Sequence, residues 1–86
     1  MEIVKNDYFE LGEQKYITLD TYNYLDNSYI FVNELTSEEE PTKNFKVFKN
    51  INNGLIEETD KEVLEIVLKY FESNFNLMLD EYDINN

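Results

Sequence analysis

The sequence contains no cysteine, histidine, arginine or tryptophan. Without cysteine the chain has no disulfide framework, thiol nucleophile or thiolate metal ligand. Histidine is the commonest general base and transition-metal ligand, and no arginine is present to clamp a phosphate. An enzyme built from this chain would therefore depend on carboxylates, lysine, hydroxyls and tyrosine. No pair of carboxylates is marked for catalysis, so we expect a non-catalytic protein and assign no catalytic residue, metal ligand or cofactor.

Long apolar runs are missing as well. No stretch approaches the roughly 20 apolar residues of a membrane span, and residues 1–7 show no basic region followed by an apolar run. We therefore expect a cytoplasmic protein without membrane contact. The net charge of −12 repels nucleic acid and anionic lipid, and no basic patch counters it. Direct binding to nucleic acid is not expected.

The length of 86 residues corresponds to one domain. A chain this short buries only about 60–65% of its unfolded surface, so it needs nearly every large apolar side chain for its own core. We predict a single α+β domain over residues 1–79 and an acidic tail over residues 80–86. The carboxylates of this tail and of the run Glu38 to Glu40 lack the spacing of a calcium loop and are interpreted as solvated surface.

The segment from Thr59 to Leu79 has the pattern of a long amphipathic helix. Thr59 and Glu62 have the spacing of a capping box, in which each side chain bonds the backbone amide of the other residue. At about 100° per residue, the apolar side chains that follow fall within an arc of roughly 220°. The remaining arc carries polar residues that include Glu62, Glu65 and Glu72. We expect this helix to pack across one face of a sheet.

Before the helix, apolar and polar residues alternate with period two, which predicts an antiparallel β-meander of four to five strands. The predicted strands are Asp7–Leu11, Lys15–Leu25, Ser28–Leu35, Phe45–Lys49 and Leu55–Glu58. Turns are expected at Gly12-Glu13, at Asp26-Asn27 and at residues 50–54. The residues from Thr36 to Asn44, with the one proline, are interpreted as a solvated loop.

The turn at Asp26-Asn27 fixes which side chains share a face of the sheet. It pairs Tyr24 with Tyr29 and Tyr22 with Phe31. In the same register Asn23 pairs with Ile30 and Thr21 with Val32. One face then carries Ile17, Leu19, Leu25, Ile30 and Val32, and the other carries Tyr16, Tyr22, Tyr24, Tyr29, Phe31 and Leu35. We expect the helix to cover the aliphatic face.

The tyrosine-rich face is then left for a protein partner. Tyrosine buries a large area and still offers a hydroxyl to a wet rim, and a base-stacking platform would need nearby lysine or arginine. The candidate protein-binding residues are Tyr16, Tyr22, Tyr24, Tyr29, Phe31, Leu64, Leu68, Phe75 and Leu79. We expect a small acidic protein-binding module that acts as an adaptor. The alternative is a phage-type inhibitor whose carboxylates imitate DNA phosphates and occupy the basic groove of a nucleic-acid-binding host protein.

A homodimer is the expected way to cover an apolar face that one helix leaves open. Its contact is expected either at the face of Tyr22, Tyr24 and Tyr29 or at the helix edge of Leu64, Leu68, Phe75 and Leu79. Because two copies bring −24 together, such a dimer should tighten as salt screens the repulsion.

The order of these segments also resembles a known family. The chain has Tyr8 to Gly12, Tyr16 to Thr21, Tyr29 to Glu34 and Phe45 to Val47 ahead of an acidic helix rich in valine, leucine and phenylalanine. This pattern over residues 7–75 is similar to the small acidic domain-of-unknown-function proteins of Gram-positive bacteria and their phages, the YrzB-like family. The resemblance implies a strand ending in Asp-Thr, a tyrosine-rich hairpin and a C-terminal helix. It brings no activity and no functional residue.

Overall fold

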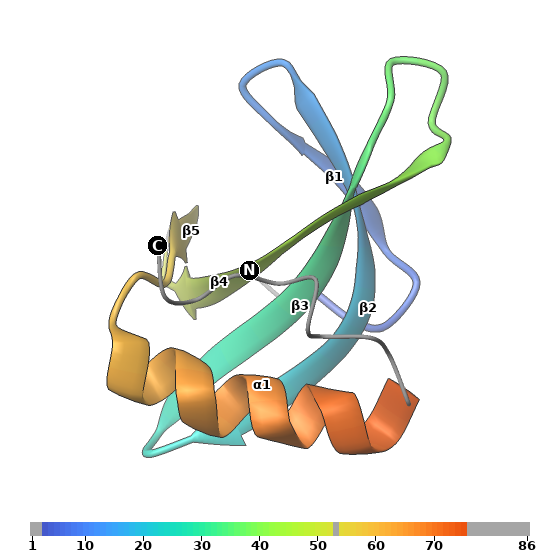
Figure 1. Cartoon of the computed structure of the whole chain (residues 1–86). Coiled ribbons are helices and arrows are strands. Elements are labelled where there is room, and N and C mark those ends of the chain that lie inside the picture. The colour runs from blue at the N-terminus through green and yellow to red at the C-terminus, as the bar shows by residue number, and fades with distance from the viewer. Residues whose placement is uncertain (1–2, 53, 76–86) are drawn as a thin grey trace.

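The computed structural model describes residues 3–52 and 54–75 of the chain as an α+β fold (Figure 1). Five antiparallel strands lie side by side in chain order, and a single helix follows them. The meander prediction is therefore confirmed. The elements are β1 (Tyr8–Leu11), β2 (Gln14–Tyr24), β3 (Asn27–Leu35), β4 (Pro41–Ile51), β5 (Gly54–Glu57) and α1 (Lys61–Phe75).

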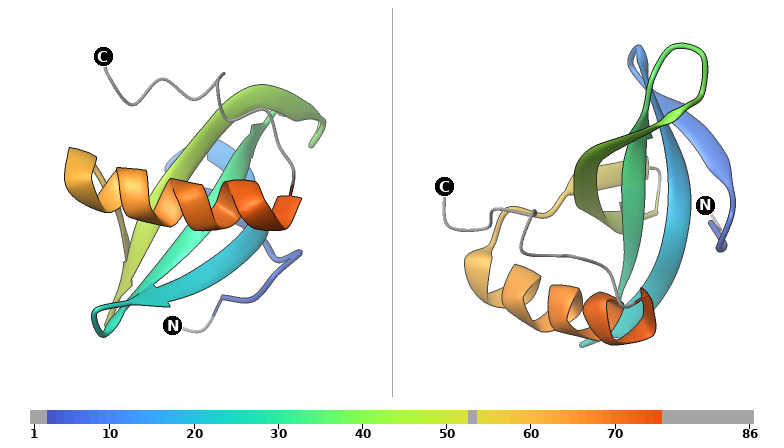
Figure 2. Two further views of the ribbon diagram at one scale, coloured as in Figure 1. Left: turned by 60° about the horizontal axis from the view of Figure 1, so that its bottom comes forward. Right: turned by 45° about the vertical axis from the view of Figure 1, so that its right-hand side comes forward.

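The sheet is strongly curled, as the two views of Figure 2 show. The rings of Phe9 on β1 and Phe48 on β4 have centroids only 6.3 Å apart, although two strands separate them. In a flat sheet three strand spacings would separate them by about 14 Å. The curl therefore closes a small apolar core on the concave side of the sheet. This core contains Tyr16, Ile30, Val32 and Phe48, with Ile3, Phe9, Leu11 and Leu55 packed against it.

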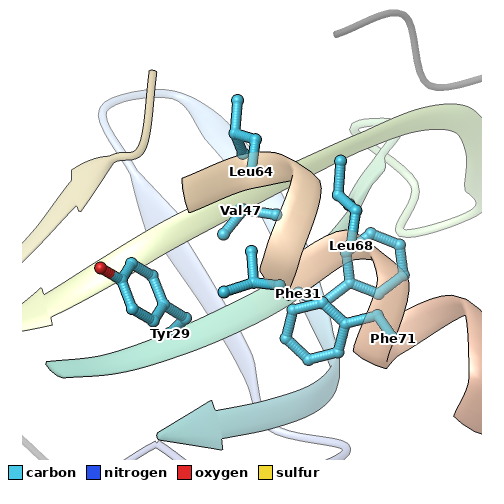
Figure 3. Packing of buried hydrophobic residues seen from close by; sticks show 7 residues of the cluster. Tyr29, Phe31, Val47, Leu64, Leu68 and Phe71 are labelled. Carbon is cyan, nitrogen blue, oxygen red and sulfur yellow. The ribbon is translucent and has the colours of Figure 1, made fainter. Parts of the chain in front are cut away.

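The helix lies across the convex face (Figures 1 and 2), where a second core forms. Its buried members are Tyr29, Phe31, Val47, Leu64, Val67, Leu68 and Phe71 (Figure 3). The rings of Phe31 and Phe71 stack with centroids 4.9 Å apart. The expectation that the helix covers the aliphatic face is wrong. Ile30 and Val32 instead fill the interior of the curl, and the helix rests on the aromatic face.

The pairing of β2 with β3 differs from the predicted register. The turn lies at Leu25 and Asp26, whose φ angles of 50° and 65° are those of a type I′ turn, so Tyr22 pairs with Tyr29 rather than with Phe31. This is a shift of two positions, which keeps Tyr22 on the same face as Tyr29. The observed pairs also include Thr21 with Ile30 and Asp20 with Phe31.

A β-bulge between Thr18 and Asp20 adds one residue, Leu19, to β2. An extra residue reverses the alternation of side chains beyond it. Tyr16 therefore lies in the concave core, and Leu19 packs against the core under the helix. Both residues had been expected on the opposite faces.

Strand β4 begins at Pro41, so the predicted loop from Thr36 to Asn44 is shorter than expected. The side-chain amide of Asn33 donates to the carbonyl oxygens of Thr42 and Asn44 at 2.8 and 2.9 Å. These two bonds hold the irregular start of β4 against β3, where the register shifts between Asn33 and Leu35. The sequence pattern missed this segment because it is polar and pairs through its backbone.

The helix starts one residue later than the capping box predicted. Asp60, rather than Thr59, is the N-cap, because its Oδ1 accepts from the amides of Glu62 and Val63 at 2.9 and 3.3 Å. The helix buries Leu64, Val67, Leu68 and Phe71 and exposes Glu62, Glu65 and Glu72. The predicted helical residues 76–79 and the acidic tail 80–86 lie outside the described residues.

Candidate protein-binding site

Three tyrosine rings lie together where the β2–β3 hairpin meets the helix. The rings of Tyr22 and Tyr70 stack with centroids 4.0 Å apart and planes at 18°. The ring of Tyr24 is nearly parallel to that of Tyr22, with centroids 6.4 Å apart and planes at 14°. We call Tyr22, Tyr24 and Tyr70 the tyrosine cluster. All three side chains are half-buried, so their outer surfaces remain open to solvent.

The local sequence explains how these rings come together. Tyr22 and Tyr24 are two positions apart on one strand, so both side chains point to the helix side of the sheet. Tyr70 follows Val67 by three positions, so it projects from the flank of the helix face that is buried. Phe71 anchors this arrangement from beneath, because it is fully buried and its ring meets that of Tyr22 edge-on with centroids 6.4 Å apart.

Exposed aliphatic side chains extend the tyrosine cluster. Ile66 lies one helical turn before Tyr70 and is 39% exposed. Leu25 follows Tyr24 at the tip of the hairpin and is 73% exposed. Two carboxylates neighbour these residues, because Asp26 follows Leu25 in the turn and Glu62 precedes Ile66 by one helical turn. The cluster is therefore an aromatic and aliphatic surface with an acidic rim.

The structure divides the predicted binding residues into three groups. Tyr22 and Tyr24 lie in the tyrosine cluster. Five others are at most 6% exposed and are covered by the chain's own packing: Tyr16 in the concave core, and Tyr29, Phe31, Leu64 and Leu68 under the helix. A partner could not reach these five without unfolding the domain. Nothing is described of the side chain of Phe75, the last residue of α1, and Leu79 lies outside the described residues.

Sequence reasoning missed three members of this surface. The helical pattern places Tyr70 and Ile66 on the apolar side of the helix. It does not predict which residues of that side lie at the edge of the sheet. Leu25 was assigned to a strand, whereas a left-handed backbone conformation places it in the turn. The spacing of four between Ile66 and Tyr70 was the available signal, because it marks a single flank of the helix.

A polar cluster marks one end of the concave core. Lys46 Nζ lies 3.6 Å from Glu34 Oε2 and 3.3 Å from Glu57 Oε1, so one lysine ties together β3, β4 and β5. Burial raises the pKa of Tyr16, and the charges of Glu34 and Glu57 add to this rise while that of Lys46 opposes it. For Lys46, burial alone would lower the pKa, but the hydrogen bond and charge of Glu57 reverse this and raise it. This polar cluster of Lys46, Glu34 and Glu57 therefore links neighbouring strands of the sheet.

Residues 3–52 and 54–75 hold no group of three or more metal-binding carboxylates. The one helix they form is too short and too polar to cross a membrane. In comparisons with known proteins, no family model, no curated protein and no solved structure matches the chain. The resemblance to the YrzB-like family stays a prediction.

Proposed function

We propose that this protein is a small acidic, non-catalytic protein-binding module, and that its partner docks on the tyrosine cluster. The observation that carries the proposal is the stacking of Tyr22 on Tyr70 at the surface, 4.0 Å between ring centroids. Two large rings are held in one orientation by a buried phenylalanine and still keep an open side. Pre-ordered aromatic side chains bind at a small cost in conformational entropy, which is why tyrosine is enriched at binding hot spots.

The surroundings of the tyrosine cluster indicate the kind of partner. Ile66 and Leu25 supply exposed apolar area beside the rings, and Asp26 and Glu62 supply an acidic rim. An interface of this type has an apolar centre and a polar edge. The partner surface should therefore present an apolar patch bordered by lysine or arginine. Charge at the rim should speed association more than it deepens affinity.

An inhibitor that imitates DNA is the second candidate. The exposed helix face supports it, because Glu62, Glu65 and Glu72 all lie on the solvent side. Lys61 and Lys69 interrupt this row and lower its charge density. A DNA mimic binds mainly through charge, so its affinity should fall steeply as salt rises. An apolar docking site should lose little affinity under the same change.

The experiment is a quantitative capture of proteins from the native host on the immobilised chain, at low and high salt, read by mass spectrometry. Tyr22→Ala is compared with Tyr8→Ala, because Tyr8 is 61% exposed on β1 and belongs to no aromatic contact of the cluster. The proposal expects a protein that is retained in high salt by the native chain and by Tyr8→Ala but lost by Tyr22→Ala. Equal retention by both variants would contradict it. Retention only at low salt, independent of Tyr22, would instead support the DNA mimic.

A further inference from the structure

An open pocket lies beside the concave core of the sheet. Its volume of about 570 Å³ falls within the range of about 300–1,000 Å³ that is usual for small-molecule sites. Its polar lining comes from three neighbouring strands, with Thr21 and Asn23 on β2, Ser28 on β3 and Asn50 on β4. The open end of a curled sheet is a common place for such a site.

The strand register explains why these four side chains lie together. Asn23 pairs with Ser28, and Ser28 pairs with Asn50, so the three residues form one row across the sheet. Thr21 pairs with Ile30, which is buried in the concave core, and directly opposite residues share a face. Because side chains alternate along each strand, all four polar residues face the concave side. The pocket is therefore separate from the tyrosine cluster, which lies on the helix side of the sheet.

Aliphatic side chains form another part of the pocket wall. Ile3 and Val4 come from the segment before β1, and Ile51 is the last residue of β4. Val4 is 52% exposed and Ile51 is 39% exposed, in a domain with few apolar side chains to spare. The segment before β1 is held against β2, because the Asn6 N–H donates to the carbonyl oxygen of Thr18 at 2.8 Å. This part of the wall is therefore in place before any ligand binds.

The lining is uncharged, in contrast to the chain as a whole. Charged residues make up 30% of the sequence, yet none lines the pocket in the described parts of the chain. Within the same parts, no hydrogen bond occupies the side chains of Thr21, Asn23 and Ser28. A hydroxyl or a carboxamide can both donate and accept hydrogen bonds. These side chains are therefore suited to a ligand whose own groups also do both.

We propose that this pocket binds a neutral sugar. Sugar hydroxyls donate and accept hydrogen bonds as the lining side chains do, and the C–H groups of a sugar ring can pack against Val4 and Ile51. The net charge of −12 disfavours an anionic ligand. A cationic ligand would find no carboxylate in the described lining to pair with. Because the pocket is open on one side, it covers only part of a ligand, and we expect weak binding in the millimolar range.

Titration of the ¹⁵N-labelled full chain with sugars, followed through its amide chemical shifts, tests this proposal. The neutral probes are glucose, maltose and N-acetylglucosamine, and the charged probes are glucuronate and glucosamine. We expect at least one neutral sugar to shift the amides of Thr21, Asn23 and Ser28 saturably, with a dissociation constant on the order of 1–10 mM. At equal concentration the charged sugars should shift these amides at least about threefold less, because a charge finds no partner in the pocket.

Two asparagine variants distinguish the pocket from the general surface. Asn23→Ala removes a carboxamide from the lining and should weaken binding by at least about threefold. Asn44→Ala is the matched control, because Asn44 is also exposed on a strand but lies outside the lining, and it should bind sugar as the native chain does. Tyr22→Ala should also leave sugar binding unchanged, which separates this site from the protein-binding site. The amide spectrum of each variant shows directly whether it is folded.

The unaltered chain alone can overturn the proposal. It would be wrong if none of the neutral sugars shifted these amides saturably at up to about ten times the expected dissociation constant. Equal shifts from glucuronate would also contradict it, because they would show no preference for a neutral ligand. So would native affinity in a folded Asn23→Ala variant.

Discussion

Tyr22 of the β2–β3 hairpin lies nearly parallel to Tyr70 of the helix, with ring centroids 4.0 Å apart. In the sequence, strands β3, β4 and β5 lie between Tyr22 and Tyr70, yet the two side chains share one surface. Their contact links the hairpin to the helix and leaves one side of each ring open. Structure and proposed binding therefore depend on the same pair.

A double-mutant cycle should detect the stacking energy of this pair. We expect Tyr22→Ala and Tyr70→Ala to be less than additive in the free energy of unfolding, with a coupling of about 0.5–1.5 kcal/mol. Urea denaturation of the two single variants and the double variant measures it. Additive effects would mean that the rings contribute independently, through burial alone.

The start of the helix gives a second prediction. Because Asp60 accepts from two amides of the first turn, Asp60→Ala should lower the free energy of unfolding by about 1 kcal/mol. Thr59→Ala is the matched control and should have little effect. Urea denaturation of both variants compares them, and a larger loss for Thr59→Ala would favour the capping box expected from sequence.

Replacement of Thr18 should not lower the free energy of unfolding, in contrast to replacement of Asp60. The Thr18 side chain is fully buried, and its Oγ1 has no hydrogen-bond partner among the described residues. Valine has nearly the same shape without the hydroxyl, so Thr18→Val should leave stability unchanged or raise it by about 1 kcal/mol. A shift of the thermal midpoint to higher temperature would agree, and a loss of stability would reveal a partner for this hydroxyl.

High pH should destabilise the fold. Burial raises the pKa of Tyr16 and of Tyr29 above the usual value of 10.0, and the pKa of Lys46 is also raised. A raised pKa in the folded state means that folding favours the protonated form, so the stabilisation is complete below the unfolded pKa and is lost as pH rises through the folded pKa. The urea midpoint should fall above about pH 10. The double variant Tyr16→Phe with Tyr29→Phe should show a smaller fall.

The sequence predicted the order of the elements, because hydrophobic periodicity is a local property. Alternation placed five strands and the helical repeat placed one helix, each within a few residues of its position. Polar segments were harder to assign. Residues 41–44 belong to β4 through backbone pairing and the amide of Asn33, and a sequence pattern records neither.

The sequence could not determine which side chains share a face of the sheet, because a single extra residue in a strand or turn changes the answer. The bulge residue Leu19 makes the side chains before it lie on the opposite faces from those that regular alternation with the later residues would give. The turn also lies one residue earlier than predicted, which shifts the register between β2 and β3 by two positions. The curl of the sheet, which places Ile30 and Val32 inside, is a property of the whole sheet. For the same reason the candidate site was only partly predicted: Tyr22 and Tyr24 were named, but five other named residues are core.

The central claim is that a protein partner docks on the tyrosine cluster, and calorimetric titration of the captured partner tests it most directly. We expect Tyr70→Ala to weaken binding by more than about tenfold, or 1.4 kcal/mol. Tyr8→Ala should bind as the native chain does, and high salt should change the affinity little. Native affinity in a folded Tyr70→Ala variant would contradict the claim.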